Sequence, residues 1–322
     1  MNSVSGVRGI VGKGLTPVVV SRYAGAFGSM IGRGTIVIGR DTRISGEMME
    51  HAVLSGLMAA GCSVLNLGIS TTPTIQLAVE RKKAKGGIAI TASHNPAEWN
   101  AMKFLDERGM YLTEDKRLEL ENIMAGGATN FVEFDKLGAE TKVSDFDDEH
   151  IKAILGIKEI EVEKIRKRQF KAVVDCVNGA GSRILPRLLE ELGCEVARIH
   201  CEPGGIFPRG PEPIPENLGL LCKLVKENRA DIGFACDPDG DRLSVVDENG
   251  NSIGEEYSLV LSAMQVLSRK SGPVATNLST TSAIDAVADR YGAKVFRTKV
   301  GEIHVAQEMI DNGCVIGGEG NG

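Results

Sequence analysis

Three aspartates alternate with other residues in one short segment between two apolar runs of the chain. Asp237, Asp239 and Asp241 lie in the segment 235–242, which reads ACDPDGDR. Carboxylates this close together repel one another unless a cation neutralises them. Hard oxygen ligands favour Mg²⁺, which keeps room for water or a phosphate oxygen. The segment therefore predicts a divalent metal site that holds one Mg²⁺.

Two other interpretations of this aspartate segment are weaker. A Pro-Asp-Gly turn forms without a metal, but such a turn does not require three aspartates. An EF-hand loop would place Glu248 at its twelfth position, but Arg242 then occupies the position that requires glycine. The flanking residues Ile232–Cys236 and Leu243–Val246 also read as strands, whereas an EF-hand has helices on both sides.

A hydroxyl, an imidazole and a carboxamide follow another apolar run. The residues Ile88–Thr91 read as a buried strand, and Ser93, His94 and Asn95 come directly after it, before Pro96 stops further pairing. Polar side chains just past a strand end are typical of active-site loops in α/β proteins. A plain polar turn is the alternative. The surrounding sequence TASHN does not match G-x-S-x-G, which disfavours a serine hydrolase.

Two glycine-rich segments near the ends of the chain carry further polar groups. The segment Ser5–Gly12 contains Arg8, and a flexible loop there would let backbone amides and one guanidinium converge on an anion. The segment Gly317–Gly322 contains Glu319 and Asn321, whose side chains suit sugar hydroxyls. An ordinary loop and a frayed terminus are the alternatives for the two segments.

A repeated pattern of strand, helix and strand positions these segments. It occurs first at Thr35–Ile38 and Ser63–Leu67, and the phrases AGCSVLNLG, LGCEVARIH and YGAKVFRTK mark the same junction three times. Each unit is a β-α-β crossover, which requires parallel neighbouring strands covered by helices. We therefore expect three similar α/β domains at residues 1–150, 151–251 and 252–322. One large doubly wound sheet is the alternative.

The composition of the chain excludes several classes of protein. The 322 residues carry a net charge of −6, with one Trp and four Tyr. Without a basic stripe or aromatic platforms, nucleic acid is not an expected partner. No apolar run reaches the ~18 residues of a membrane span, and we expect a cytoplasmic protein. The seven cysteines form no C-x-x-C pair, and most lie in apolar runs as core residues.

These segments, in this order, resemble the α-D-phosphohexomutase superfamily from Ser5 to Gly322. The resemblance rests on the strings TASHNP, DPDGDR and GEGNG. It implies three similar α/β/α domains with mixed, mainly parallel sheets. It also implies an enzyme that interconverts hexose 6-phosphate and hexose 1-phosphate, through an active-site phosphoserine and a bisphosphorylated sugar.

The resemblance also implies a role for each matching residue. Ser93 matches the phosphoserine and, with the three aspartates, the metal site. The other catalytic residues implied are Arg8, His94, Lys103 and Arg242, with Lys103 as general acid/base and His94 orienting the loop. The substrate-binding residues implied are Lys299, Gly301, Glu319 and Asn321. Several bacterial members have a histidine directly after T-K-x-G, where this chain has Glu302, and His304 follows two residues later.

The resemblance does not decide which hexose phosphate is the substrate or whether the chain contains every domain of the family. The strings RDTRISGEM, TKVGE and GGEGNG are most similar to archaeal-type phosphoglucosamine mutases, which interconvert glucosamine 6-phosphate and glucosamine 1-phosphate. Phosphomannomutase/phosphoglucomutase activity is the alternative, and glucose or glucosamine 1,6-bisphosphate is the implied activator.

Family members continue through the rest of domain III and a fourth domain, which we expect to be absent here. A non-catalytic sugar-phosphate-binding module and a phosphatase are the other readings, and we expect a monomer or homodimer.

Overall fold

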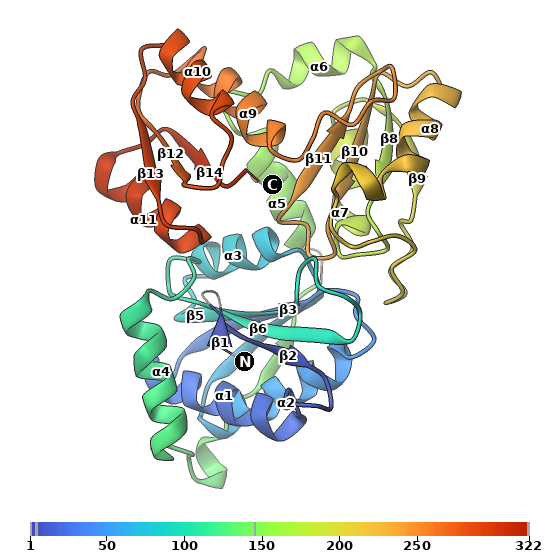
Figure 1. The fold of residues 1–322 in the computed structure, drawn as a ribbon. Helices are drawn as coiled ribbons and strands as arrows, with labels where there is room; N and C mark the ends of the chain where they lie inside the picture. Colours follow the sequence, from blue (N-terminus) through green and yellow to red (C-terminus); the bar gives the residue numbers. More distant parts are fainter. Residues whose placement is uncertain (1, 4–5, 145, 321–322) are drawn as a thin grey trace.

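The strands of the chain form three separate sheets. The computed structural model describes residues 2–3, 6–144 and 146–320, and within them the sheets have seven, four and three strands. Figure 1 shows each sheet in its own α/β unit, with the first unit below the other two. The predicted fold class of three α/β/α domains is confirmed, and the single large sheet is excluded. Residue 150, the first predicted boundary, lies inside a helix.

The first unit is a mixed sheet with helices on both faces. Its strands, in spatial order, are β1 (Asn2–Ser3), β2 (Gly6–Ile10), β6 (Trp99–Leu105), β5 (Gly86–Ile90), β3 (Thr35–Arg40), β4 (Ser63–Ile69) and β7 (Glu140–Lys142). Its helices are α1 (Pro17–Met30), α2 (Gly46–Ala59), α3 (Thr72–Arg81) and α4 (Glu114–Gly126), with a short 3₁₀ turn η1 (Phe134–Lys136). The β5–β3, β3–β4 and β4–β7 pairs are parallel, and the β1–β2, β2–β6 and β6–β5 pairs are antiparallel.

Alternation along the central strands explains the three layers of this unit. On β3, Ile36 and Ile38 pack with α1 and α2, whereas Val37 between them packs with Ile75 of α3. All three side chains are fully buried. A strand that is covered on both faces requires a continuous apolar run, and TIVIG supplies it. Helix α3 therefore covers the face that Figure 1 shows turned toward the other two units.

The second unit has a four-stranded sheet in the order β11 (Leu243–Val246), β10 (Ile232–Cys236), β8 (Lys171–Asp175) and β9 (Glu195–Ile199). Only the β10–β11 pair is antiparallel. Helices α5 (Phe146–Leu155) and α6 (Val162–Arg168) lead into this unit. Its other helices are α7 (Gly181–Glu191) and α8 (Gly219–Glu227), with a 3₁₀ turn η2 (Pro215–Asn217). The loop between β10 and β11 carries the three aspartates.

The third unit has a parallel sheet in the order β13 (Val295–Thr298), β12 (Val274–Asn277) and β14 (Ile316–Gly318). Its helices are α9 (Tyr257–Leu267), α10 (Ala283–Arg290) and α11 (Glu302–Asn312). Ile303, at the start of α11, is buried in the same apolar cluster as Ile75 of α3. The third unit is therefore anchored on the first through these two helices.

Most predicted strands agree with the structure, and the differences lie at loops. Strands β10 and β11 have the predicted bounds, whereas β5 ends at Ile90, one residue earlier than predicted. The predicted loop over Ser5–Gly12 is wrong over its described part, because Gly6–Ile10 is strand β2 and its amides serve the sheet. Across the described residues, no helix combines the length and the apolar character that a bilayer crossing requires.

Candidate active site

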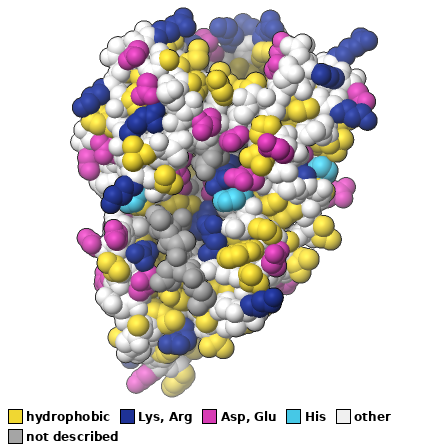
Figure 2. All heavy atoms as spheres, in the orientation of Figure 1, with side chains coloured by type: hydrophobic (Ala, Val, Ile, Leu, Met, Phe, Trp, Pro, Cys, Tyr) yellow, Lys and Arg dark blue, Asp and Glu magenta, His cyan; other side chains and the backbone are white. Residues whose placement is uncertain are grey.

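A cavity of about 390 Å³ lies where the three units meet. Its wall includes Ser93 and Lys103 from the first unit, Asp241 and Arg242 from the second, and Glu302 and Glu319 from the third. Figure 2 shows acidic, basic and histidine side chains gathered around the hollow in the middle of this face. The wall therefore combines apolar surface with charged groups of both signs, which suits a charged polar ligand.

Ser93 sits at the first turn after β5 in an unusual backbone conformation. Its φ of +49° is in the left-handed region, which residues other than glycine rarely adopt. The Ser93 N–H donates to Thr91 Oγ1 at 2.9 Å, which ties the turn to the residue before it. Ser93 Oγ donates to Asp237 Oδ2 at 2.6 Å and lies 3.3 Å from His94 Nδ1. The turn thus directs the hydroxyl of the first unit at the aspartate loop of the second.

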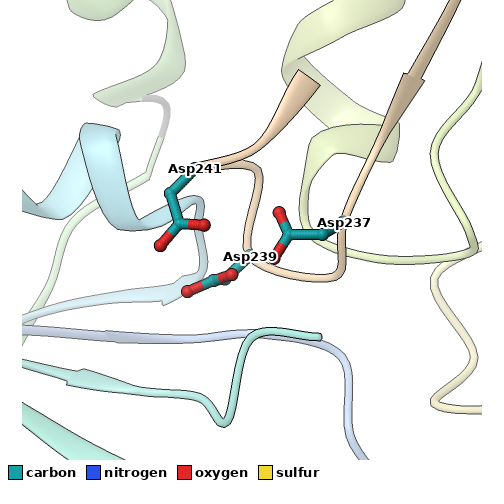
Figure 3. A group of neighbouring side chains, drawn as sticks. All are labelled: Asp237, Asp239 and Asp241. Atoms are coloured by element: carbon teal, nitrogen blue, oxygen red, sulfur yellow. The ribbon is translucent and has the colours of Figure 1, made fainter. Parts of the chain in front are cut away.

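The three aspartates of the β10–β11 loop point toward one another (Figure 3). One oxygen of each of Asp237, Asp239 and Asp241 lies within 4.8 Å of the other two, so the cluster could hold a metal ion. The first two side chains are buried, and the third is half-buried at the cavity. Asp239 Oδ1 is buried without a hydrogen-bond partner among the described residues. An orphaned buried carboxylate oxygen beside two further carboxylates fits a hard divalent cation such as Mg²⁺.

The pKa values of Asp237 and Asp239 are shifted in opposite directions. Burial, and then the charges of Asp239 and Asp241, raise the pKa of Asp237 well above its usual range. Burial alone would also raise the pKa of Asp239, but the charge of Lys103 and several hydrogen bonds outweigh it and lower that pKa. The carboxyl that touches the serine therefore holds a proton more tightly than the one that pairs with lysine. A cation between them would favour loss of that proton.

Lys103 on β6 is the cation that already neutralises part of this cluster. Its Nζ lies 2.7 Å from Asp239 Oδ2 and 2.8 Å from Asp241 Oδ2, and the residue is only 4% exposed. Burial alone would lower the pKa of the Lys103 ammonium, but the two carboxylates together raise it well above its usual value. In this arrangement Lys103 is charged and can give up a proton only to a strong base.

Thr72 is a further contact that the sequence did not predict as a site residue. Its Oγ1 donates to Asp239 Oδ2 at 2.7 Å, and its N–H donates to the Asp239 carbonyl at 2.8 Å. Thr71 caps α3 by accepting from Thr74 N. The segment STTP therefore predicts the start of a helix, but the contact with a loop 167 residues away is not visible in it. Because Thr72 and Lys103 occupy Oδ2, Asp239 is left with Oδ1 free for a ligand.

Two arginines predicted as site residues border the serine and the aspartates. Arg8 lies on β2 and donates from Nη1 to Asn95 Oδ1 at 2.7 Å, while its buried Nε has no hydrogen-bond partner among the described residues. The Arg242 N–H donates to Asp237 Oδ1 at 3.2 Å, and the Arg242 guanidinium pairs with Glu212. Both arginines line the cavity, where they can bind phosphate oxygens.

His94, next to the serine, also lines the cavity. Burial, and then the charge of Arg242, lower the pKa of its imidazole. The ring is therefore neutral at pH 7, and its Nδ1 is close enough to exchange a hydrogen bond with Ser93 Oγ.

The predicted sugar-binding residues of the third unit are only partly brought together. Glu319 Oε1 accepts from Asn277 Nδ2 at 2.6 Å and from the Gly301 N–H at 2.7 Å, and both Glu319 and Gly301 line the cavity. Asn277 was not predicted, since nothing in VATN marks it as a partner of residue 319. Lys299 is exposed and is not among the described residues of the cavity wall. Asn321 lies outside the described residues.

Glu302, the first residue after the TKVG segment, lies on the wall of the cavity. Gln76 Nε2 of α3 donates to its Oε1 at 3.1 Å, so the pair joins the first and third units across the cleft. Protein atoms surround the carboxyl, yet water within the cleft still reaches it. Burial, and then the charge of Asp241, raise the pKa of Glu302 to about 7. His304 does not contribute to the cavity wall.

Profiles of one family match all three units. They are described as phosphoglucomutase/phosphomannomutase α/β/α domains I, II and III, and they match residues 2–130, 148–250 and 254–322. The second and third profiles cover all strands of the second and third sheets, and the first profile covers the first sheet except β7.

Individual proteins agree with these profiles. A phosphoglucomutase/phosphomannomutase of Thermococcus kodakarensis is 42% identical over 98% of this chain and 70% of its own length. A protein of Methanopyrus kandleri described as "probable phosphoglucosamine mutase" is 40% identical over 99% of this chain and 70% of its own. Among solved structures, a phosphoglucomutase/phosphomannomutase family protein of Burkholderia thailandensis has 30% identity and a TM-score of 0.87. Its alignment covers all of this chain and 72% of that one.

Proposed function

This chain belongs to the phosphoglucomutase/phosphomannomutase family of phosphohexomutases, and we propose that it transfers a phosphoryl group through a phosphorylated Ser93. Phosphoserine would donate its phosphoryl group to the free hydroxyl of a hexose phosphate. The bisphosphorylated sugar then turns within the cavity, and its other phosphate returns to the serine. The net reaction interconverts hexose 6-phosphate and hexose 1-phosphate.

One observation carries this proposal: the 2.6 Å hydrogen bond between Ser93 Oγ and Asp237 Oδ2. It brings a buried hydroxyl from the first unit to the acidic cluster of the second, on the wall of a cavity that contains arginines. A phosphate on Ser93 would be a dianion, and a dianion beside three carboxylates requires a cation. The closeness of the hydroxyl and the acidic cluster therefore supports a phosphoryl-transfer site.

The aspartates and Ser93 are the residues that would hold Mg²⁺. When bound, the ion would neutralise the phosphoserine oxygens and the charge that develops during transfer. Arg8 and Arg242 are placed to bind phosphate oxygens near the serine, since Arg8 donates to Asn95 of the serine loop and the Arg242 N–H donates to Asp237. In phosphoryl transfer, positioning and charge neutralisation supply most of the catalysis.

The proton balance of the step assigns two further roles. As the P–O bond to Ser93 breaks, the serine oxygen must gain a proton, and the ammonium of Lys103 is the candidate donor. As the new P–O bond forms, the sugar hydroxyl must lose a proton. Glu302 is the candidate acceptor, because a pKa of about 7 suits proton transfer at neutral pH. The two exchange roles when the phosphate returns.

Glucosamine 6-phosphate and glucosamine 1-phosphate are the substrates we favour. The relative from Methanopyrus kandleri carries a phosphoglucosamine mutase name at 40% identity. Phosphomannomutase/phosphoglucomutase activity is the second candidate, since the Thermococcus kodakarensis relative at 42% identity carries that name. In either case Glu319, held by Asn277 and Gly301, is the candidate for ring hydroxyls, and the matching hexose 1,6-bisphosphate is the candidate activator.

A coupled mutase assay tests this proposal against its rivals. The enzyme is mixed with each hexose 6-phosphate, Mg²⁺ and the matching 1,6-bisphosphate, with Ser93→Ala as control. Formation of hexose 1-phosphate well above the control supports the mutase. Saturable binding of sugar phosphate without turnover would support a binding module, and steady phosphate release without isomerised sugar would support a phosphatase.

A further inference from the structure

A fully buried arginine lies beneath the serine loop, although nothing in the mechanism above uses it. Arg43, in the loop between β3 and α2, is 1% exposed. Its Nη2 donates to the carbonyls of Ser93 at 2.5 Å and Asn95 at 2.8 Å. Its Nη1 donates to the carbonyls of Pro96 at 2.7 Å and Trp99 at 3.2 Å. One side chain therefore holds four carbonyls of the segment 93–99.

The fifth hydrogen bond of this guanidinium goes to a buried aspartate. Arg43 Nε donates to Asp41 Oδ2 at 2.9 Å, and neither side chain is exposed. An arginine has five N–H donors in a rigid plane, and all five of Arg43 are used here. The buried charge is both paired and fully hydrogen-bonded, which is the arrangement that burial of an ion requires.

The same aspartate reaches the serine from its other side. Thr91 Oγ1 donates to Asp41 Oδ2 at 2.7 Å, and it accepts the Ser93 N–H at 2.9 Å. The pair of Arg43 and Asp41 thus fixes the carbonyl of Ser93 directly and its N–H through Thr91. Ser93 needs such restraint, because its φ of +49° costs conformational energy for a residue with a side chain.

The arginine loop also contacts the second unit, which carries the aspartates. The guanidinium of Arg43 lies 5.0 Å from the ring centre of Phe207. Next to it, Thr42 Oγ1 donates to the carbonyl of Asn178 at 2.8 Å. The group that orders the serine loop is therefore also fixed relative to the unit that receives the serine hydroxyl.

We propose that Arg43 is the positioning residue of the phosphoserine loop, which holds Ser93 in the strained turn that directs Oγ at Asp237. The proposal rests on the phosphoserine mechanism proposed above. Arg43 acts through the backbone of Ser93 and does not touch the substrate. Its loss must therefore slow phosphoryl transfer to and from Ser93 more than it weakens the binding of sugar phosphate or metal.

The test compares Arg43→Lys with the wild-type enzyme. Lysine keeps the buried positive charge but has three donors on one atom, so it cannot span four carbonyls. We expect phosphorylation of Ser93 by hexose 1,6-bisphosphate, followed by rapid quench and mass spectrometry, to slow about 100-fold, as small misplacements of reacting groups do. The Mg²⁺ dissociation constant and the KM for hexose phosphate should stay within about threefold of wild type.

Arg117→Lys is the matched control. Arg117 lies on α4 and pairs with Glu121 of the same helix, outside the serine loop. Its variant should phosphorylate at the wild-type rate. In Arg43→Ala, added guanidinium should restore part of the lost rate, whereas the same concentration of methylammonium should not. A purely structural role predicts no such selectivity.

Each outcome decides a different claim. If Ser93 of the wild-type enzyme takes no phosphate, the proposed function fails and Arg43 has no loop to position. If the wild-type enzyme is phosphorylated and Arg43→Lys reacts at the same rate, only the Arg43 proposal is overturned. Should the Arg43 variants not fold, Thr91→Val removes the hydroxyl that accepts the Ser93 N–H at 2.9 Å. That variant should slow phosphorylation about tenfold, and an unchanged rate would contradict the proposal.

Discussion

Ser93 Oγ and Asp237 Oδ2 lie 2.6 Å apart although 144 residues separate them in the chain. The hydroxyl belongs to the turn after β5 in the first unit, and the carboxyl belongs to the aspartate loop of the second. The hydrogen bond therefore depends on how the two units are docked. Thr72 of α3 fixes the same loop through the side chain and the carbonyl of Asp239. The chemistry proposed for this protein is located at that junction.

Removing charge from the aspartate cluster should weaken metal binding. Asp239→Asn replaces a buried carboxylate whose Oδ1 is free for a ligand. We expect the Mg²⁺ dissociation constant, measured by calorimetry, to rise at least tenfold, since a lost ligand charge costs on the order of 1.4 kcal/mol or more. Glu248→Gln, in the exposed turn after β11, is the control and should bind Mg²⁺ as the wild type does. Equal affinities for all three proteins would show that the metal binds elsewhere.

The metal-free protein should depend on Lys103 for stability. Lys103→Met leaves Asp239 and Asp241 without their cation, and breaking a buried ion pair costs about 3 kcal/mol. We expect a lower midpoint of urea unfolding without metal, and recovery of most of the loss in excess Mg²⁺. Lys82→Met, which breaks a more exposed pair with Glu149, should cost less than about 1 kcal/mol and should not respond to Mg²⁺. If Mg²⁺ does not reduce the loss of stability in Lys103→Met, the metal does not neutralise the carboxylates that pair with Lys103.

Much of the architecture follows from the sequence, because it depends on local patterns. The runs IGFAC and LSVV predict β10 and β11 with their observed bounds, and the alternation of aspartates between them predicts a cluster. These features need only neighbouring residues: apolar side chains for a buried strand, and charges too close to coexist without a cation.

The rest of the site depends on contacts between units, which no local pattern encodes. Thr72 looks like a helix cap, Asn277 like the end of a strand, and Arg43 like a surface arginine after Asp-Thr. The structure buries Arg43 and pairs Asn277 with Glu319, 42 residues away. Lys299 is the opposite case, since a motif predicts it at the site and its side chain is exposed, so that its role stays a prediction. Only the docking of the three units distinguishes these cases.

The activity should fall at acidic pH because Glu302 becomes protonated. Its carboxyl has a pKa of about 7, so the fraction able to accept a proton falls as the pH drops below that value. We expect kcat/KM of the wild type to fall on the acidic side of about pH 7. Glu302→Gln should lower the plateau about 100-fold, the usual contribution of a general base. In that variant only a limb near pH 6 should remain, because the substrate phosphate titrates there. Profiles of the same shape for both proteins would exclude Glu302 as the proton acceptor.

Sugar recognition should depend on Asn277 although it does not line the cavity. Asn277→Ala removes the donor that holds Glu319 Oε1 at 2.6 Å, which leaves Gly301 N–H as the remaining partner of that oxygen among the described residues. We expect the KM for hexose phosphate to rise about tenfold, the effect of one misplaced charged hydrogen bond. Asn312→Ala, at the exposed end of α11, is the control and should keep the wild-type KM. An unchanged KM in Asn277→Ala would contradict the role of Glu319 in sugar binding.

Peptide mapping of the phosphorylated protein tests the central claim most directly. The enzyme is incubated with Mg²⁺ and hexose 1,6-bisphosphate, quenched, digested and analysed by mass spectrometry beside Ser93→Ala. We predict one added phosphate, located on Ser93 and lost when excess hexose phosphate is supplied. A phosphate on any other residue, or an equally phosphorylated Ser93→Ala, would contradict the account.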